Sequence, residues 1–215
     1  MRTRVKICGI TNLTDAETAV AAGADALGFI FVPQTPRYIT PDNATEIIQA
    51  LSPFITTVGV FRNAEHKVIE NIATQTGITS VQLHGVESPE FCTQLSLPVI
   101  KVFELHSDFK LKTIDAYNVS ACLVDKPKSI TTGTINLKLA QKARHHTNRL
   151  ILAGGLTPQN VADVVQYVKP DAVDVASGVE SEKRQKDHQK IKAFIRAVRQ
   201  ADEVRTEDAN NNPDI

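Results

Sequence analysis

Short apolar segments alternate with longer amphipathic segments along almost the whole chain. The short segments are rich in Val, Ile and Leu and contain few polar residues, a pattern typical of parallel strands that are buried on both faces. The pattern predicts eight strands, at Arg4–Cys8, Ala26–Phe31, Thr56–Phe61, Ser80–Leu83, Val99–Phe103, Ala121–Val124, Arg149–Ala153 and Ala172–Val175.

Each predicted strand is followed by a segment with helical spacing. The first, NLTDAETAVAAG, has Thr14 as a candidate N-cap, Glu17 three residues later and Gly23 at its end, as expected of a capped helix. Thr40 precedes Pro41 at the second helix, and proline is favoured at the first helical position. The segments SPEFC and TPQNV repeat this start, and the remaining helical segments are NAEHKVIENIATQTG, DFKLKTIDAY, NLKLAQKARHH and KDHQKIKAFIRAVRQA.

Eight strand–helix units in 215 residues favour a single α/β domain with the (βα)8 TIM-barrel fold. We expect the barrel to span residues 1–201 and the polar segment Asp202–Ile215 to form a disordered tail. A doubly wound open sheet is the alternative, but the phosphate-binding pattern GxGxxG is missing after the first strand. In both folds the chemistry lies at the carboxyl ends of the strands.

The composition excludes several classes of partner. Lys plus Arg and Asp plus Glu both number 24, so no basic surplus indicates nucleic acid or a membrane surface as a partner. No apolar run is long enough to cross a bilayer, and charged residues interrupt the N-terminus where a signal segment would lie. The three cysteines lack CxxC spacing, so neither a disulfide framework nor a zinc site is expected. We therefore expect a cytoplasmic protein without a bound metal, and a monomer rather than a homodimer.

Two glycine-containing segments stand at the ends of the seventh and eighth strands. Gly154 and Gly155 follow the seventh strand, and Ser177 and Gly178 follow the eighth. Glycines let backbone N–H groups approach an anion closely, and these two loops of such a barrel commonly bind phosphate. Either pair alone is better explained as a tight turn. The two pairs on adjacent loops favour a site for a small phosphorylated substrate.

An acid and a base also stand at strand ends. Asp125 follows the apolar run ACLV, so partial burial is expected to raise its pKa and suit it to donating a proton; a salt bridge to Lys126 or Lys128 is the alternative. Cys8 ends the first strand, where a stabilised thiolate can accept a proton from carbon. Most such cysteines are inert core residues. Lys6 lies two residues earlier and shares the strand face of Cys8.

Three further polar residues lie at the same end of the predicted barrel. Arg37 lies in a loop stiffened by Pro33 and Pro36, where a fixed guanidinium suits a ligand carboxylate; an ordinary surface arginine is equally compatible. Asp174, at the end of the eighth strand, is suited to bind sugar hydroxyls or to orient another group. His84 is more readily explained as a hydrogen-bonded rim residue than as a catalytic one.

A series of motifs resembles one known family. In chain order they are KICGIT, ALGFIF with TPRYI, GVF, VQLHG, LVD, LAGGLTPQNV and VDVASGVE, from Lys6 to about Glu180. Together they resemble N-(5'-phosphoribosyl)anthranilate isomerase. The resemblance implies a TIM barrel without cofactor or metal. Its reaction would be the Amadori rearrangement of N-(5-phosphoribosyl)anthranilate to 1-(2-carboxyphenylamino)-1-deoxyribulose 5-phosphate, the third step of tryptophan biosynthesis.

The resemblance implies a role for each candidate residue. Cys8 is similar to the general base that removes the C2' proton, and Asp125 to the general acid that assists opening of the ribose ring. Arg37 resembles the residue that contacts the anthranilate carboxylate, and Asp174 resembles a further active-site carboxylate. The phosphate cradle would consist of Gly154, Gly155, Ser177 and Gly178.

The loop after the sixth strand departs from the family pattern. A glycine-rich loop and a Phe-Asp-Trp segment are usual there, whereas this chain reads DKPKSITTGTINLKLAQ and keeps only Gly133. We expect activity to survive with weaker substrate affinity. The alternatives are a catalytically silent barrel that binds a phosphorylated ligand, and a related sugar-phosphate isomerase of histidine biosynthesis. The latter calls for an aspartate where this chain has Cys8, and indole-glycerol-phosphate synthase calls for a Lys–Glu pair not found here.

Overall fold

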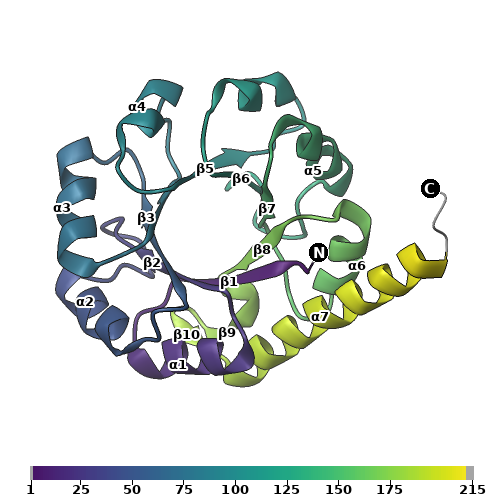
Figure 1. Cartoon of the computed structure of the whole chain (residues 1–215), viewed down its shortest axis with the longest axis horizontal. Coiled ribbons are helices and arrows are strands. Elements are labelled where there is room, and N and C mark those ends of the chain that lie inside the picture. The colour runs from purple at the N-terminus through teal and green to yellow at the C-terminus, as the bar shows by residue number, and fades with distance from the viewer. Residues whose placement is uncertain (1, 212–215) are drawn as a thin grey trace.

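The computed structural model of the chain describes residues 2–211. Its eight main strands close into a barrel of parallel strands in chain order (Figure 1), and β1 closes the ring by pairing with both β2 and β8. The expected TIM barrel is confirmed, and the open-sheet alternative is wrong. The strands are β1 (Arg4–Cys8), β2 (Ala26–Ile30), β3 (Thr56–Phe61), β4 (Ser80–Leu83), β5 (Val99–Glu104), β6 (Ala121–Asp125), β7 (Leu150–Leu152) and β8 (Ala172–Val175).

Helices surround the barrel on its outside (Figure 1). The α-helices are α1 (Leu13–Ala22), α2 (Pro41–Ala50), α3 (His66–Thr76), α4 (Pro89–Gln94), α5 (Leu137–Ala143), α6 (Val161–Val168) and α7 (His188–Asn211). The structure also has three short 3-10 helices within residues 2–211: η1 (Leu111–Ala116), η2 (Arg144–His146) and η3 (Ser177–Val179). A small hairpin of β9 (Glu180–Glu182) and β10 (Gln185–Lys186) lies between β8 and α7.

Two helix starts agree with the sequence and three helical segments differ from it. Thr40 and Ser88 cap α2 and α4 through their side chains, each followed by proline. In α1 the cap is Asn12 rather than Thr14, because the Asn12 side chain accepts from the N–H of Asp15. The segment 108–117 forms only the 3-10 helix η1, and TPQN forms a turn before α6.

The last helix is longer than the sequence suggested. We expected the polar segment from Asp202 to be a disordered tail, but α7 continues to Asn211 and projects past the barrel (Figure 1). Asp202 also accepts hydrogen bonds from the N–H and hydroxyl of Thr3, at 2.6 and 2.8 Å. The final residues of the expected tail, 212–215, lie outside the described residues.

Two apolar layers hold the barrel and place its polar residues. The larger layer packs the outward-facing strand side chains against the helices, and it includes Val5 and Ile7 of β1. A smaller cluster takes alternate positions of the strands, including Val102 and Leu123. Because side chains alternate along a strand, Lys6 and Cys8 face the barrel interior.

Candidate active site

A cavity of about 900 Å³ opens at the carboxyl ends of the barrel strands. All eight predicted site residues line it: Cys8, Arg37, Asp125, Gly154, Gly155, Asp174, Ser177 and Gly178. The closed barrel brings them together from β1, β6 and β8 and from the connecting loops. Lys6 does not line the cavity but lies directly beneath it.

Cys8 lies beside a buried ion pair. The ammonium of Lys6 donates to the Asp174 carboxylate at 3.0 Å, and both side chains are almost fully buried. A Cβ on Gly28 would lie 2.8 Å from the Cys8 sulfur and 2.9 Å from Lys6 Nζ, so the thiol and the ammonium share one small space. Asp174, which the sequence left with two possible roles, therefore orients Lys6 next to the thiol.

The charge balance around Cys8 works against its ionisation in the free protein. Burial raises the pKa of the thiol, and the Asp174 carboxylate raises it further, while Lys6 and the more distant Lys186 lower it in part. Although burial disfavours the ammonium, its contacts with Asp174 and Cys8 raise the pKa of Lys6 overall. Lys6 is therefore a permanent cation at neutral pH, available to stabilise a thiolate.

Asp125 has the properties expected of a proton donor. Burial raises its pKa to about 6, opposed by a hydrogen bond from the N–H of Lys126 at 2.7 Å and supported by the charges of Asp174 and Glu104. Gly154 makes room for this arrangement, since a Cβ there would lie 2.9 Å from Asp125 Oδ1. The contact with Lys126 is made by its backbone N–H and is not a salt bridge.

Two polar side chains from β4 and the loop that follows it also face the cavity. Gln82 is 2% exposed, and no hydrogen bond in the described structure reaches its amide oxygen. His84 Nε2 lies 4.0 Å from Asp125 Oδ2 and is equally without a hydrogen bond among residues 2–211. Burial lowers the pKa of His84 to about 4, so its imidazole is neutral at pH 7. Gln82 lies inside β4 and His84 directly follows it, both in the motif VQLHG.

Arg37 reaches the cavity but is already bound on one edge. Its Nε and Nη2 donate to the two carboxylate oxygens of Glu180, each at 2.7 Å. Lys186 Nζ donates to the same carboxylate at 3.0 Å. Gly9 permits this path, because a Cβ there would lie 2.5 Å from Arg37 Cδ. Glu180 ends the motif VDVASGVE. No sequence pattern indicated its contact with Arg37 or a role for Lys186, because these depend on contacts across the fold.

The two glycine loops pack closely against their neighbours. A Cβ on Gly178 would lie 1.8 Å from the carbonyl oxygen of Leu156, and one on Gly155 would lie 2.2 Å from that of Gly133. Gly154 and Gly155 both have a positive φ, which favours glycine. The divergent loop after β6 is therefore in direct contact with the loop after β7, and the Ile135 N–H donates to the Gly154 carbonyl at 3.1 Å.

Comparison with known proteins identifies the family. The family model described as N-(5'phosphoribosyl)anthranilate (PRA) isomerase matches residues 5–197. The chain belongs to the PRA isomerase family. The protein of that name from Geobacter sulfurreducens is 48% identical over 200 residues, which cover 91% of this chain and 98% of the relative. The one from Trichlorobacter lovleyi is 44% identical over 202 residues, covering 92% and 98%.

Solved structures of PRA isomerases have the same fold. The Thermotoga maritima enzyme superposes with a TM-score of 0.87 at 40% identity, covering 92% of this chain and 99% of that one. A second structure, at 38% identity with a TM-score of 0.83 and the same coverage, contains reduced 1-(o-carboxyphenylamino)-1-deoxyribulose 5-phosphate. This chain is thus an isomerase of tryptophan biosynthesis. Within residues 2–211 there is no helix with the length and apolarity needed to cross a membrane.

Proposed function

We propose that Cys8 and Asp125 carry out the PRA isomerase reaction as general base and general acid. Asp125 gives a proton to the ribose ring oxygen, and the ring opens to the Schiff base. Cys8 then takes the proton from C2', and the resulting enolamine tautomerises to the ketone product. The observation that carries this proposal is the pKa of about 6 for Asp125, in the same cavity that the Cys8 thiol lines.

Arg37 supports binding of a substrate carboxylate. Glu180 occupies the Nε–Nη2 edge of its guanidinium, and the Nη1 edge is left for a second carboxylate. Arginine binds carboxylates through two parallel N–H bonds, so one bound edge orients the other. The contact with Glu180 therefore fits a guanidinium held in place for the anthranilate carboxylate.

The remaining contacts are proposed from the cavity lining. The loops after β7 and β8 would hold the phosphate through backbone N–H groups at Gly154, Gly155, Ser177 and Gly178, all of which line the cavity. The amide oxygen of Gln82, unpaired within residues 2–211, would accept a hydrogen bond from a substrate O–H or N–H. A buried acceptor without a partner is costly, and a bound substrate would remove that cost.

The experiment compares Cys8→Ala with Cys92→Ala in steady-state kinetics. Cys92 is buried in α4 away from the cavity, so its variant controls for loss of a buried thiol. General acid–base groups contribute about 10²–10⁴-fold, and we expect kcat to fall by that factor in Cys8→Ala alone. A silent binding barrel predicts no turnover in the unchanged protein and equal ligand binding by both variants. Full activity of Cys8→Ala would remove Cys8 from the proposed mechanism.

The proposal extends to the state of the enzyme in the cell. We infer a cytoplasmic enzyme, because all three cysteines are free. We also infer a monomer, whereas one structural neighbour is described as a monomeric form of the dimeric enzyme from Thermotoga maritima. Sedimentation equilibrium tests the oligomeric state. We expect the mass of one chain, and the mass of two chains would contradict the inference of a monomer.

A further inference from the structure

Two groups of paired charges influence the Cys8 thiol. On β1 and β8, Lys6 pairs with Asp174. A second group joins Arg37 from the loop after β2 to Glu180 of β9 and Lys186 of β10. The two groups together contain three cations and two carboxylates, and both act on the Cys8 thiol. Within these two groups, one positive charge is therefore unmatched until a negative charge forms among them.

Lys186 is the cation of the second group that lies outside the substrate cavity. Its side chain is fully buried, and its ammonium donates to the Ala176 carbonyl at 2.9 Å and to Glu180 Oε1 at 3.0 Å. Burial lowers the pKa of Lys186, and the Glu180 carboxylate only partly offsets this effect. Burying a charge is expensive unless it is paired, yet Glu180 is already shared with Arg37.

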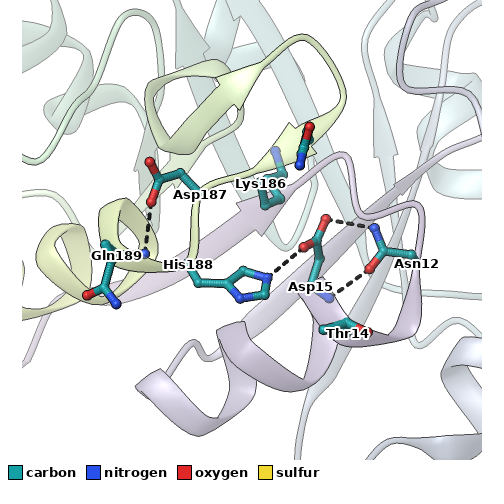
Figure 2. Close-up of a pocket in the computed structure, with 8 residues that line it drawn as sticks. Asn12, Thr14, Asp15, Lys186, Asp187, His188 and Gln189 are labelled. Atoms are coloured by element: carbon teal, nitrogen blue, oxygen red, sulfur yellow. Dashed lines mark hydrogen bonds and ion pairs between the residues drawn. The ribbon is translucent and has the colours of Figure 1, made fainter.

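The two residues that follow Lys186 are held in place by contacts with other elements. Figure 2 shows the neighbouring His188 at the start of α7 reaching Asp15 of α1, with Nε2 2.9 Å from Oδ1. Asn12 in turn holds the second oxygen of Asp15 at 2.8 Å. The N–H of Asp187 donates to the Val179 carbonyl at 2.8 Å. These contacts fix the chain next to Lys186, whose ammonium donates to the carbonyl of Ala176, a residue that lines the cavity.

We propose that Lys186 is a positioning residue for the reaction, which supplies the surplus positive charge that balances a Cys8 thiolate and holds Glu180 against Arg37. The inference rests on the proposed role of Cys8 as base. Lys186 is not among the residues that line the cavity, so it would act through charge and through Glu180. The charged groups that act on the Cys8 thiol are Lys6, Asp174, Arg37 and Lys186. Glu180 is bound to the last two, and Asp125 lines the same cavity.

The sharpest test removes, in separate variants, the cation and the carboxylate of the buried Lys186–Glu180 pair. The pH dependence of Cys8 alkylation by iodoacetamide, followed by the mass of the Cys8 peptide, reports the thiol pKa without turnover. Lys186→Met removes a cation and keeps most of the stem, so we expect the pKa of Cys8 to rise by about one pH unit. Glu180→Gln removes a carboxylate and should shift it downward.

Two further variants complete the design. Lys192→Met removes an exposed lysine of α7 and makes the same change in net charge, so it should leave the alkylation profile unchanged. Lys186→Arg keeps the charge and should restore the original profile if Lys186→Met folds poorly. A merely structural Lys186 predicts lower thermal stability with no change in the Cys8 pKa.

Equal profiles for Lys186→Met and Lys192→Met would overturn the inference, and so would shifts of the same sign in Lys186→Met and Glu180→Gln. Because alkylation is read in the absence of substrate, this outcome is distinct from failure of the Cys8 mechanism. That failure would appear as retained turnover in Cys8→Ala.

Discussion

Asp125 is the residue whose environment most directly predicts pH-dependent activity. Burial raises its pKa to about 6, and the carboxylate of Glu104 contributes to the rise. In the proposed mechanism, the active form has a protonated Asp125 and a Cys8 thiolate. With the pKa of Cys8 raised above that of a free thiol, the population of this form grows with pH up to about 6, stays level, and falls above the thiol pKa.

We therefore predict that kcat/KM rises with pH and levels off near pH 6. We call the rising part the lower limb, and we expect it to shift in Glu104→Gln. Loss of the Glu104 charge removes a repulsion from the Asp125 carboxylate, so the pKa of Asp125 falls and the limb moves to lower pH. Profiles of kcat/KM against pH for the two proteins measure this shift.

Asp163→Asn is the control, because Asp163 lies on α6 and does not line the cavity. The lower limb of the kcat/KM profile of Asp163→Asn should stay at the same pH as in the unchanged protein. A limb near pH 6 that does not move in Glu104→Gln would mean that another group titrates there.

At the residue scale, the sequence was informative where a polar residue ends an apolar strand. Cys8 and Asp125 end their strands, Asp174 lies one residue before the end of β8, and all three line the cavity. The partners of these residues were not predictable. Glu180 is 143 positions from Arg37 along the chain, and only the closed barrel with its added hairpin places the two together.

At the element scale, the loops after β6 and β7 form one unit. The Gly133 carbonyl occupies the space that a side chain on Gly155 would need. Lys126 Nζ also donates to this carbonyl at 3.0 Å, which holds the loop after β6 folded back. The divergent loop thus supports, by backbone contacts, the end of the cavity where we propose that phosphate binds, although it lacks the glycine cluster usual in the family.

Gly155→Ala is predicted to weaken substrate binding. The new Cβ would meet the Gly133 oxygen at 2.2 Å, and φ is +75°, so both loops must shift. We expect KM to rise about 10-fold, the equivalent of one or two hydrogen bonds, with a smaller effect on kcat. Steady-state kinetics and the inhibition constant of inorganic phosphate measure the effect.

Gly77→Ala is the matched control for Gly155→Ala. Gly77 has a φ of +72° at the end of α3, and within residues 2–211 a Cβ added there would have no neighbour closer than 4 Å. It therefore carries the same backbone strain without the contact, and KM should be unchanged. Equal KM values for the two variants would show that the contact between the loops has no role in binding.

The elements were predictable where one physical cause dominates. Strand positions follow from burial on both faces, and β1, β3, β4 and β8 have the predicted bounds. The segment 108–117 was not predictable, because its apolar spacing fits a helix while only Ile114 of η1 is buried. Most of the stability of a helix in a protein comes from packing of its apolar face, and one buried side chain in η1 supplies little of it.

At the scale of the whole molecule, the barrel is closed by contacts between the two ends of the chain. The pairing of β1 with β8 closes the ring, and α7 packs beside both α1 and α6. The bonds from Thr3 to Asp202 fasten α7 to the start of the chain. Composition alone placed Asp202 in a disordered tail, because a polar sequence does not reveal that one of its members has a buried partner.

Asp202→Ala is therefore predicted to destabilise the barrel. Thr3 is 3% exposed, and the variant leaves its N–H and hydroxyl without their acceptor. The expected cost is about 1–3 kcal/mol, or a fall in Tm of about 2–4 °C for each kcal/mol in a chain of this size. Thermal denaturation followed by circular dichroism measures this loss of stability.

Glu203→Ala is the control, since Glu203 is exposed on the same turn of α7 and its loss should leave Tm unchanged. If both variants melt together with the unchanged protein, the barrel is stable without Asp202 and the boundary at residue 201 is the better description. If only Asp202→Ala has a lower Tm, the stable domain extends beyond residue 201. The contact between the start of the chain and α7 then stabilises the closed barrel.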